Sequence, residues 1–224
     1  MENWKNYNIK LINKSIKLLN ENRNSEFNSE EERCYPHIRD LVAITIANMN
    51  LDTVRILDYG SNLMPWSNIQ NKVNIKKITV KIFDPYAEED YSKNINFGFP
   101  ISLENKLDNL IKYDYDLIIF GSSSQYINNF YEKLIAKVIK LPKTVFFLDT
   151  PYSLSNDFQF KQIDQLKREH TVYIRSFSKL ISIMDQKGYV VKFRSALPWE
   201  TQEFLDKKLS SGIKMLNLLF EKLI

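Results

Sequence analysis

The sequence has 224 residues, of which 44% are hydrophobic and 26% charged, as in an ordinary soluble globular domain. The net charge of +4 is spread along the chain, and basic clusters such as Lys76-Lys77 are only pairs, so nucleic acid is not an expected partner. The single cysteine, Cys34, can form no internal disulfide, which fits a reducing compartment. Because no signal-peptide pattern and no apolar run of about 18 residues is present, we expect a cytoplasmic protein without a membrane span.

Two segments before residue 50 carry apolar side chains at helical spacing. The residues concerned are Trp4, Tyr7, Leu11, Ile12, Leu18 and Leu19, and then Ile38, Leu41, Val42, Ile46 and Met49. Residues 21–32 between them are polar and rich in Asn, Ser and Glu, which predicts a connection or a hinge. We therefore expect residues 1–50 to form a helical cap or lid.

From Val54 onward, short apolar runs rich in β-branched residues alternate with helical patterns. The runs are typical of strands buried on both faces, and they cover residues 54–59, 77–83, 116–121, 144–149 and 189–197. Helices are predicted over residues 102–111, with Ser102 as the cap, over 130–138 and over 177–184. This alternation predicts an α/β fold, a Rossmann-like doubly wound and mostly parallel sheet over residues 51–199.

The last segment of the chain has apolar residues at helical spacing. They are Phe204, Leu205, Leu209, Ile213, Leu216, Phe220 and Leu223. An amphipathic helix is predicted over residues 200–224, which packs on the core or joins the subunits of a homodimer. No strand is expected after Leu197.

Polar residues stand where the predicted parallel strands end, and ligands of such sheets bind at those ends. The first strand ends in Asp58-Tyr59-Gly60-Ser61-Asn62, where glycine allows a tight turn and close approach of a ligand. The second ends in Asp84-Pro85, and the Asp84 carboxylate is suited to accept hydrogen bonds from the two hydroxyls of a ribose. Glycine is absent from positions 62 and 65, so the G-x-G-x-x-G pattern of NAD-binding proteins is not present.

The layout of Asp58-x-Gly60 followed by Asp84 resembles the class I S-adenosylmethionine-dependent methyltransferase family. Three further segments resemble a bacterial methyltransferase subfamily found among surface-polysaccharide (O-antigen and capsule) genes. They are DLIIFGSSSQYI (116–127), TVFFLDTPYS (144–153) and GYVVKFRSALPW (188–199). The resemblance covers about residues 54–199.

The resemblance implies S-adenosyl-L-methionine as cofactor and a set of residues that bind it. Those residues are Asp58, Tyr59, Gly60, Ser61, Asn62, Asp84, Pro85, Gly121, Ser122, Ser123 and Gln125. It also implies O-methylation of a sugar or of a nucleotide-linked or other sugar-linked small acceptor in capsule or lipopolysaccharide biosynthesis. Asn62 stands where the family has its second glycine, so a protein of the same fold that has lost the cofactor is the alternative.

A hydroxyl acceptor has a high pKa, so the reaction requires a group that takes the proton. Candidates are Asp149, Tyr126, His37 and His170, of which Asp149 ranks first because it follows a strand. Asp149 is also readable as a carboxylate that caps the following turn. Among the aromatic residues near the motifs, Trp66, Phe97, Phe99 and Trp199 are expected to pack in the core, with Phe97 or Phe99 as an alternative neighbour of the adenine ring. No metal site is expected, because Glu88-Glu89-Asp90 is one solvated run.

Overall fold

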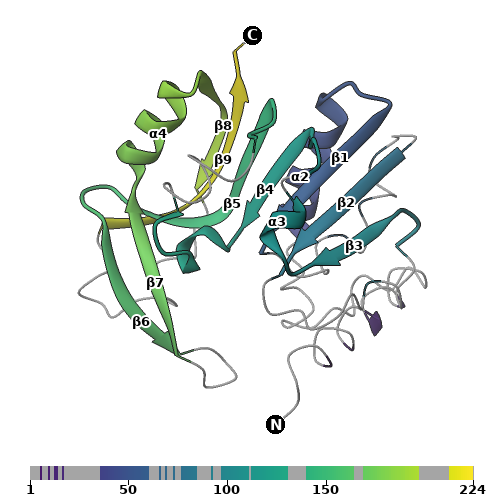
Figure 1. Cartoon of the computed structure of the whole chain (residues 1–224). Coiled ribbons are helices and arrows are strands. Elements are labelled where there is room, and N and C mark those ends of the chain that lie inside the picture. The colour runs from purple at the N-terminus through teal and green to yellow at the C-terminus, as the bar shows by residue number, and fades with distance from the viewer. Residues whose placement is uncertain are drawn as a thin grey trace. The chain divides into compact units, whose positions relative to one another are not determined.

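The computed structural model describes part of the chain. The described residues are 36–60, 77–84, 97–110, 112–130, 140–163, 169–196 and 212–223, with single positions at 6, 10, 13, 14, 17, 66, 69, 73 and 92. The chain divides into two compact units, Met1–Tyr115 and Asp116–Ile224, and each is described by itself (Figure 1).

The first unit contains three parallel strands. Its elements in chain order are α2 (Pro36–Asn48), β1 (Thr53–Tyr59), β2 (Lys77–Phe83), β3 (Ile101–Glu104) and α3 (Leu107–Leu110). Within the sheet, β2 lies between β1 and β3, and the register runs from Thr53 opposite Lys77 to Tyr59 opposite Phe83. The carboxyl halves of β1 and β2 carry consecutive buried residues, which is the burial expected when both faces of a parallel sheet are covered.

Helix α2 confirms one of the two expected N-terminal helices. Proline suits its first position because no helical hydrogen bond needs that N–H. Val42, Ala43 and Ile46 are buried, whereas Ile44 is exposed, so the helix presents one apolar face to the core. Most of the other expected N-terminal helix lies outside the described residues.

The second unit is built around β5. Its elements are β4 (Leu117–Gly121), the 3₁₀ turn η6 (Ser124–Tyr126), β5 (Thr144–Ser153), β6 (Phe158–Ile163), β7 (Glu169–Ser176), α4 (Phe177–Gln186), β8 (Tyr189–Ala196) and β9 (Ile213–Lys222). Strand β4 pairs with β5 in parallel, and β9 pairs antiparallel along the other edge of β5. Strand β8 pairs antiparallel with the free edge of β9, and α4 lies against β8 (Figure 1).

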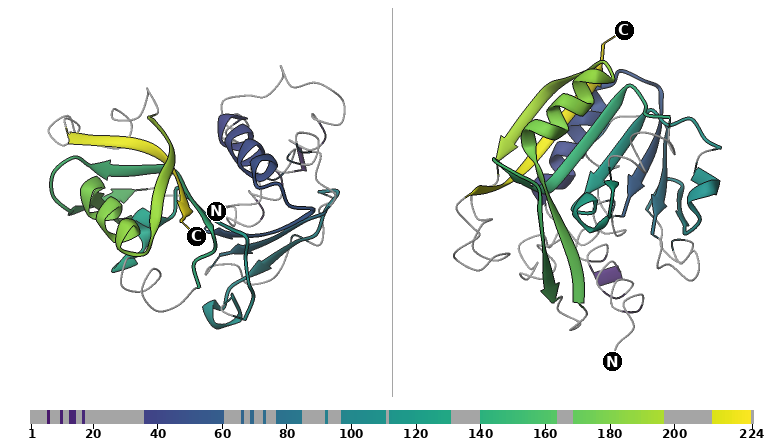
Figure 2. Two further views of the ribbon diagram at one scale, coloured as in Figure 1. Left: turned by 90° about the horizontal axis from the view of Figure 1, so that it is seen from above. Right: turned by 60° about the vertical axis from the view of Figure 1, so that its left-hand side comes forward.

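Strands β6 and β7 form an antiparallel hairpin between β5 and α4. Beyond the point where β4 ends, Tyr152 and Ser153 of β5 pair in parallel with Arg175 and Ser176 of β7. The hairpin packs through Val172, Ile174 and Ile213, with Phe158 and Phe160 against them. The hairpin projects from the end of β5, as Figure 1 and the right-hand view of Figure 2 show.

The structure confirms the expected α/β class with a mostly parallel sheet, and all five expected strands are present. The helix expected over 177–184 is confirmed as α4. Most of the helix expected over 130–138 lies outside the described residues.

Two expected elements are wrong. Residues 213–222 of the expected C-terminal helix form strand β9, because their apolar side chains fill the sheet between β5 and β8. Ser102 is not a helix cap: residues 101–104 pair with β2 as strand β3, and α3 begins only at Leu107. Strands β6 and β7 were not expected either.

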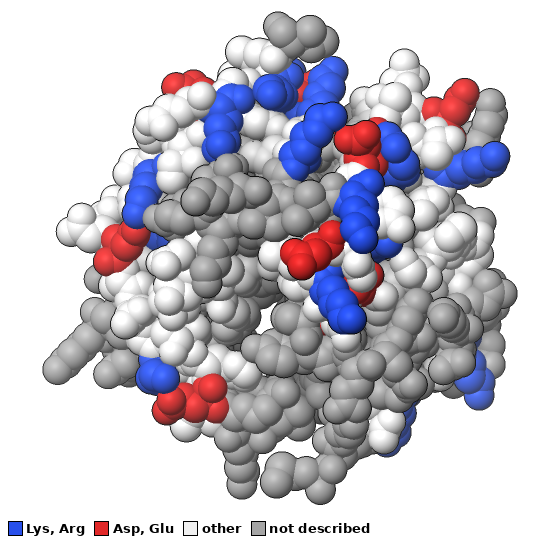
Figure 3. All heavy atoms as spheres, viewed as in Figure 1, with Lys and Arg blue, Asp and Glu red and all other residues white. Residues whose placement is uncertain are grey.

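Acidic and basic side chains lie beside one another at several points of the face drawn in Figure 3. Among the ion pairs, Glu221 contacts both Lys143 and Lys192, at 3.2 and 3.3 Å. Within the described part of the chain, no helix is both long and apolar enough to pass through a bilayer.

Candidate functional site

Gly60 and Asp84 lie side by side at the carboxyl ends of β1 and β2. The Gly60 amide donates to the Phe83 carbonyl at 2.8 Å, and the Asp84 amide donates to the Glu104 carbonyl at 3.0 Å. Gly60 has a φ of +77°, an angle that glycine adopts without the steric cost that a side chain would add. The turn predicted after β1 is therefore present, and the Asp84 carboxylate is half-buried next to it.

Asp58 lies in the interior of the first unit. It is 2% exposed, and its Oδ2 accepts a hydrogen bond of 2.7 Å from the indole Nε1 of Trp66, which is itself 1% exposed. A buried carboxylate needs such donors. Asp58 thus anchors the buried indole of Trp66, a contact that the sequence pattern did not predict.

Tyr59 is also internal. Its ring packs on that of Phe83 with centroids 4.6 Å apart, and burial raises the pKa of its hydroxyl to about 12. Phe99 contacts both Trp66 and Phe97, with centroids 6.3 and 6.4 Å apart, as expected for packing residues. Ser61, Asn62 and Pro85 lie outside the described residues.

In the second unit, Ser122 and Asp149 are joined where β4 ends beside β5. The Ser122 hydroxyl lies 2.8 Å from the Asp149 carbonyl and 3.1 Å from Asp149 Oδ2, and both oxygens are acceptors. The two residues have φ values of +47° and +48°. Left-handed angles are uncommon outside glycine and concentrate at functional sites, because neighbouring contacts must hold them.

Asn217 of β9 is one of those contacts. Its Oδ1 accepts a hydrogen bond of 2.8 Å from the Asp149 backbone N–H, and its Nδ2 donates one of 3.0 Å to Ser195 Oγ of β8. The β5–β9 register shifts between Phe147 and Thr150, so Asp149 lies in a bulge. The helix expected over residues 200–224 included Asn217, whose only signal in the sequence is a single amide between apolar residues.

Gln125 joins the same group of residues. It is 3% exposed, and its Nε2 donates to the Ser122 carbonyl at 2.8 Å. Among the described residues, no hydrogen-bond donor reaches its Oε1. A buried amide oxygen of this kind is a candidate ligand acceptor. Ser123 precedes η6 and is buried, and a Cβ added at Gly121 would meet no atom within 4 Å.

Tyr126 faces the hairpin. It is 43% exposed, its hydroxyl donates to Gln162 Oε1 at 3.2 Å, and its ring lies edge-on to His170 at 5.9 Å. The structure therefore joins Asp149 with Ser122 and Gln125, while Tyr126 and His170 pair with each other. His37 lies in the first turn of α2, and its side chain is outside the description. In the part of the chain that is described, no three His, Cys, Asp or Glu side chains gather as metal ligands.

Comparison of the sequence with family models and with curated proteins finds no match. Among solved structures, the chain is similar to Burkholderia thailandensis 1,6-didemethyltoxoflavin-N1-methyltransferase with bound 1,6-didemethyltoxoflavin and S-adenosylhomocysteine. The identity is 9% and the TM-score 0.53, and the alignment covers 100% of this chain and 92% of that one. It is also similar to an S-adenosylmethionine-dependent methyltransferase from Clostridium acetobutylicum, at 12% identity and a TM-score of 0.52, over 94% and 98% of the two chains. The chain thus has the Rossmann-like fold of class I S-adenosylmethionine-dependent methyltransferases.

Proposed function

We propose that the protein is an S-adenosyl-L-methionine-dependent methyltransferase. The observation that carries the proposal is that Gly60 bonds to the carbonyl of Phe83, the residue before Asp84, so the glycine turn and the carboxylate lie at neighbouring strand ends. A glycine turn lets a ligand approach the backbone closely, and a carboxylate at the next strand end accepts hydrogen bonds from ribose hydroxyls. This donor and acceptor chemistry fits an adenosyl group.

Asp84 is the proposed ribose ligand, and Gly60 with Ser61 and Asn62 forms the proposed turn beside the methionine portion. The internal contacts of Asp58 with Trp66 and of Tyr59 with Phe83 support a structural role for these two residues instead of contact with the cofactor. The proposed cofactor contacts also include Gly121, Ser122, Ser123 and Gln125. Of these, Gln125 has a side-chain oxygen, Oε1, that could accept a hydrogen bond from the ligand.

When bound, S-adenosyl-L-methionine supplies a methyl group that its sulfonium centre has already activated. The protein must then orient the acceptor and take up the proton that its hydroxyl releases. Asp149 is the proposed proton acceptor, because its carboxylate is fixed by the Ser122 hydroxyl on one side while Asn217 fixes its backbone on the other. Tyr126 and His37 remain as secondary candidates for this part.

The proposed acceptor is a sugar or a sugar-linked small molecule, as in capsule or lipopolysaccharide biosynthesis. The test is incubation of the purified protein with methyl-labelled cofactor and a panel of nucleotide-activated sugars. Transfer of label to one sugar, lost in Asp149→Asn, supports the proposal. If S-adenosylhomocysteine binds but label reaches no sugar, the acceptor assignment is wrong. Failure to bind either form of the cofactor favours the alternative, a protein that keeps the fold without the cofactor.

A further inference from the structure

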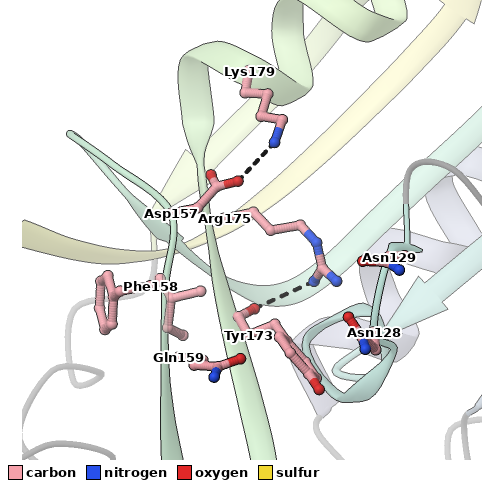
Figure 4. A pocket seen from close by; sticks show the side chains of 9 residues that line it. Asn128, Asn129, Asp157, Phe158, Gln159, Tyr173, Arg175 and Lys179 are labelled. Carbon is pink, nitrogen blue, oxygen red and sulfur yellow. Dashed lines mark hydrogen bonds and ion pairs between the residues drawn. The ribbon is translucent and has the colours of Figure 1, made fainter.

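A cleft of about 360 Å³ opens on the second unit between the β6–β7 hairpin and the loop after η6. Its volume lies within the range of small-molecule sites, about 300–1,000 Å³. Asn128 and Asn129 line one side, and Phe158 and Gln159 of β6 line the other (Figure 4). The function proposed above assigns no role to these four residues.

The side chains of the cleft bear amides and aromatic rings. Asn128, Asn129 and Gln159 each carry both a donor and an acceptor, which is also the hydrogen-bonding character of a hydroxyl group. The ring of Tyr173 adds an apolar face beside them, whereas the ring of Phe158 points away from the cleft and packs against Val172 and Ile174 (Figure 4). This combination suits a molecule with several hydroxyls on a carbon ring.

The cations of the cleft already have acceptors. Lys179 Nζ contacts Asp157 Oδ2 at 2.8 Å. Arg175, 8% exposed, donates through Nη1 to the carbonyls of Ser124 and Tyr173 at 2.8 and 3.3 Å, and through Nη2 to the carbonyl of Ile127. Figure 4 shows two of these contacts as dashed lines. Because the cations already contact oxygen acceptors, the cleft favours a neutral ligand over a phosphate or a carboxylate.

The inner wall of the cleft adjoins the residues around Asp149. Tyr173 and Arg175 line the cleft and also border a gap too narrow to hold a water molecule, whose other walls include Gln125 and Thr150. Gln125 is the buried residue whose Oε1 meets no donor among the described residues, and Thr150 follows Asp149 directly. Arg175 thus ties η6 to the hairpin at the boundary between the two spaces.

We propose that this cleft binds a neutral, polyhydroxylated ring, a pyranoside, through the amides of Asn128, Asn129 and Gln159. That the bound pyranoside is the methyl acceptor rests on the proposed function. That the cleft binds a pyranoside does not. The hairpin that forms one wall of the cleft follows β5 in the chain, and β5 is the strand that carries Asp149.

The test is saturation-transfer difference NMR with the full chain and neutral methyl glycosides of glucose, galactose, mannose and rhamnose. The methyl glycoside of glucuronic acid and glucose 1-phosphate serve as anionic counterparts. We expect at least one neutral glycoside to bind and to be preferred over its anionic counterpart. The double variant Asn128→Ala/Gln159→Ala should weaken that binding by about tenfold or more, equivalent to about 1.4 kcal/mol. Gln186→Ala, which removes an exposed amide of α4 outside the cleft, is the matched control and should bind as the parent does.

No binding of any neutral glycoside, preference for the anionic sugars, or unchanged affinity in the double variant overturns the inference. Titration of the same samples with S-adenosylhomocysteine separates this result from the proposed function. Cofactor binding without glycoside binding removes the cleft assignment alone. Glycoside binding without cofactor binding leaves a carbohydrate site on a protein that is not a methyltransferase.

Discussion

Ser122 donates its hydroxyl to Asp149 across the boundary between β4 and β5, and both residues hold left-handed backbone angles. Each such angle in a residue other than glycine costs about 1–3 kcal/mol, so surrounding contacts must stabilise it. The hydroxyl of Ser122 and the amide of Asn217 provide those contacts. The arrangement fixes one carboxylate in a bulge of β5, beside the carboxyl end of β4.

Replacing the carboxylate tests its proposed part in catalysis. Asp149→Asn keeps the side-chain shape but cannot take up a proton, so the rate of methyl transfer should fall by about 10²–10⁴-fold. The affinity for S-adenosylhomocysteine should change little. Asp185→Asn, at an exposed position of α4, is the control. A transfer rate near that of the parent protein would show that another group takes the proton.

Asn217→Ala should destabilise the second unit. The substitution removes the acceptor of the buried Asp149 amide, and an unsatisfied buried donor costs about 1–3 kcal/mol. Urea denaturation followed by circular dichroism measures the change in the free energy of unfolding. The surface variant Gln186→Ala provides the comparison, and an Asn217→Ala loss no larger than that of the control would contradict the assigned contact.

Asn217 also shows why β9 could not be predicted from the sequence. The apolar residues Ile213, Leu216 and Phe220 fall at helical spacing, but β9 is also buried on both faces, where strands show no alternation. A helix and a doubly buried strand are then both compatible with this sequence, and the pairing with β5 and β8 makes it a strand. Residues 158–163 differ: Phe-Gln-Phe-Lys (158–161) alternates, and that period of two was a readable signal of the start of strand β6.

The sequence likewise predicts some features of the candidate site and not others. Gly60 and Asp84 could be placed at strand ends from the sequence, because the ends of buried apolar runs are visible in it. The strand end expected at Asp149 is wrong: β5 continues to Ser153, because residues 150–153 pair with β9, and Asp149 lies in a bulge. The orientation of Asp58 could not be predicted, because its partner Trp66 comes from a segment without periodicity. Likewise, the link of Arg175 to η6 depends on the hairpin, whose docking no local pattern encodes.

Trp66→Phe tests the internal part assigned to Asp58. The variant keeps an aromatic ring but removes the Nε1 donor from a buried carboxylate, which should lower the free energy of unfolding by about 1–3 kcal/mol. In the variant Trp66→Phe/Asp58→Asn the carboxylate charge is also gone, so part of the loss should be recovered. Equal stability of Trp66→Phe and the parent protein, measured by urea denaturation, would contradict the contact.

Asp157 makes a pH-dependent contribution to stability. Burial acts to raise the pKa of its carboxyl group, but hydrogen bonds from Lys179 and the Ser176 amide, with the charges of Lys179 and Arg175, lower it below the ordinary value of 3.8. Because the folded pKa is lowered, the stabilisation is complete above the unfolded value and is lost as the pH falls through the folded one. The difference in unfolding free energy between the parent and Asp157→Asn should therefore be constant near neutral pH and shrink below about pH 4. A difference that stays constant down to pH 2 would contradict this effect.

The central claim is that Gly60 and Asp84 hold an adenosyl group, and calorimetric titration with S-adenosylhomocysteine tests it most directly. We predict micromolar binding to the parent protein, unchanged binding to Asp108→Ala at an exposed position of α3, and loss of measurable binding in Asp84→Ala. Absence of heat at high micromolar ligand, or an Asp84→Ala variant that binds as the parent does, would contradict the account.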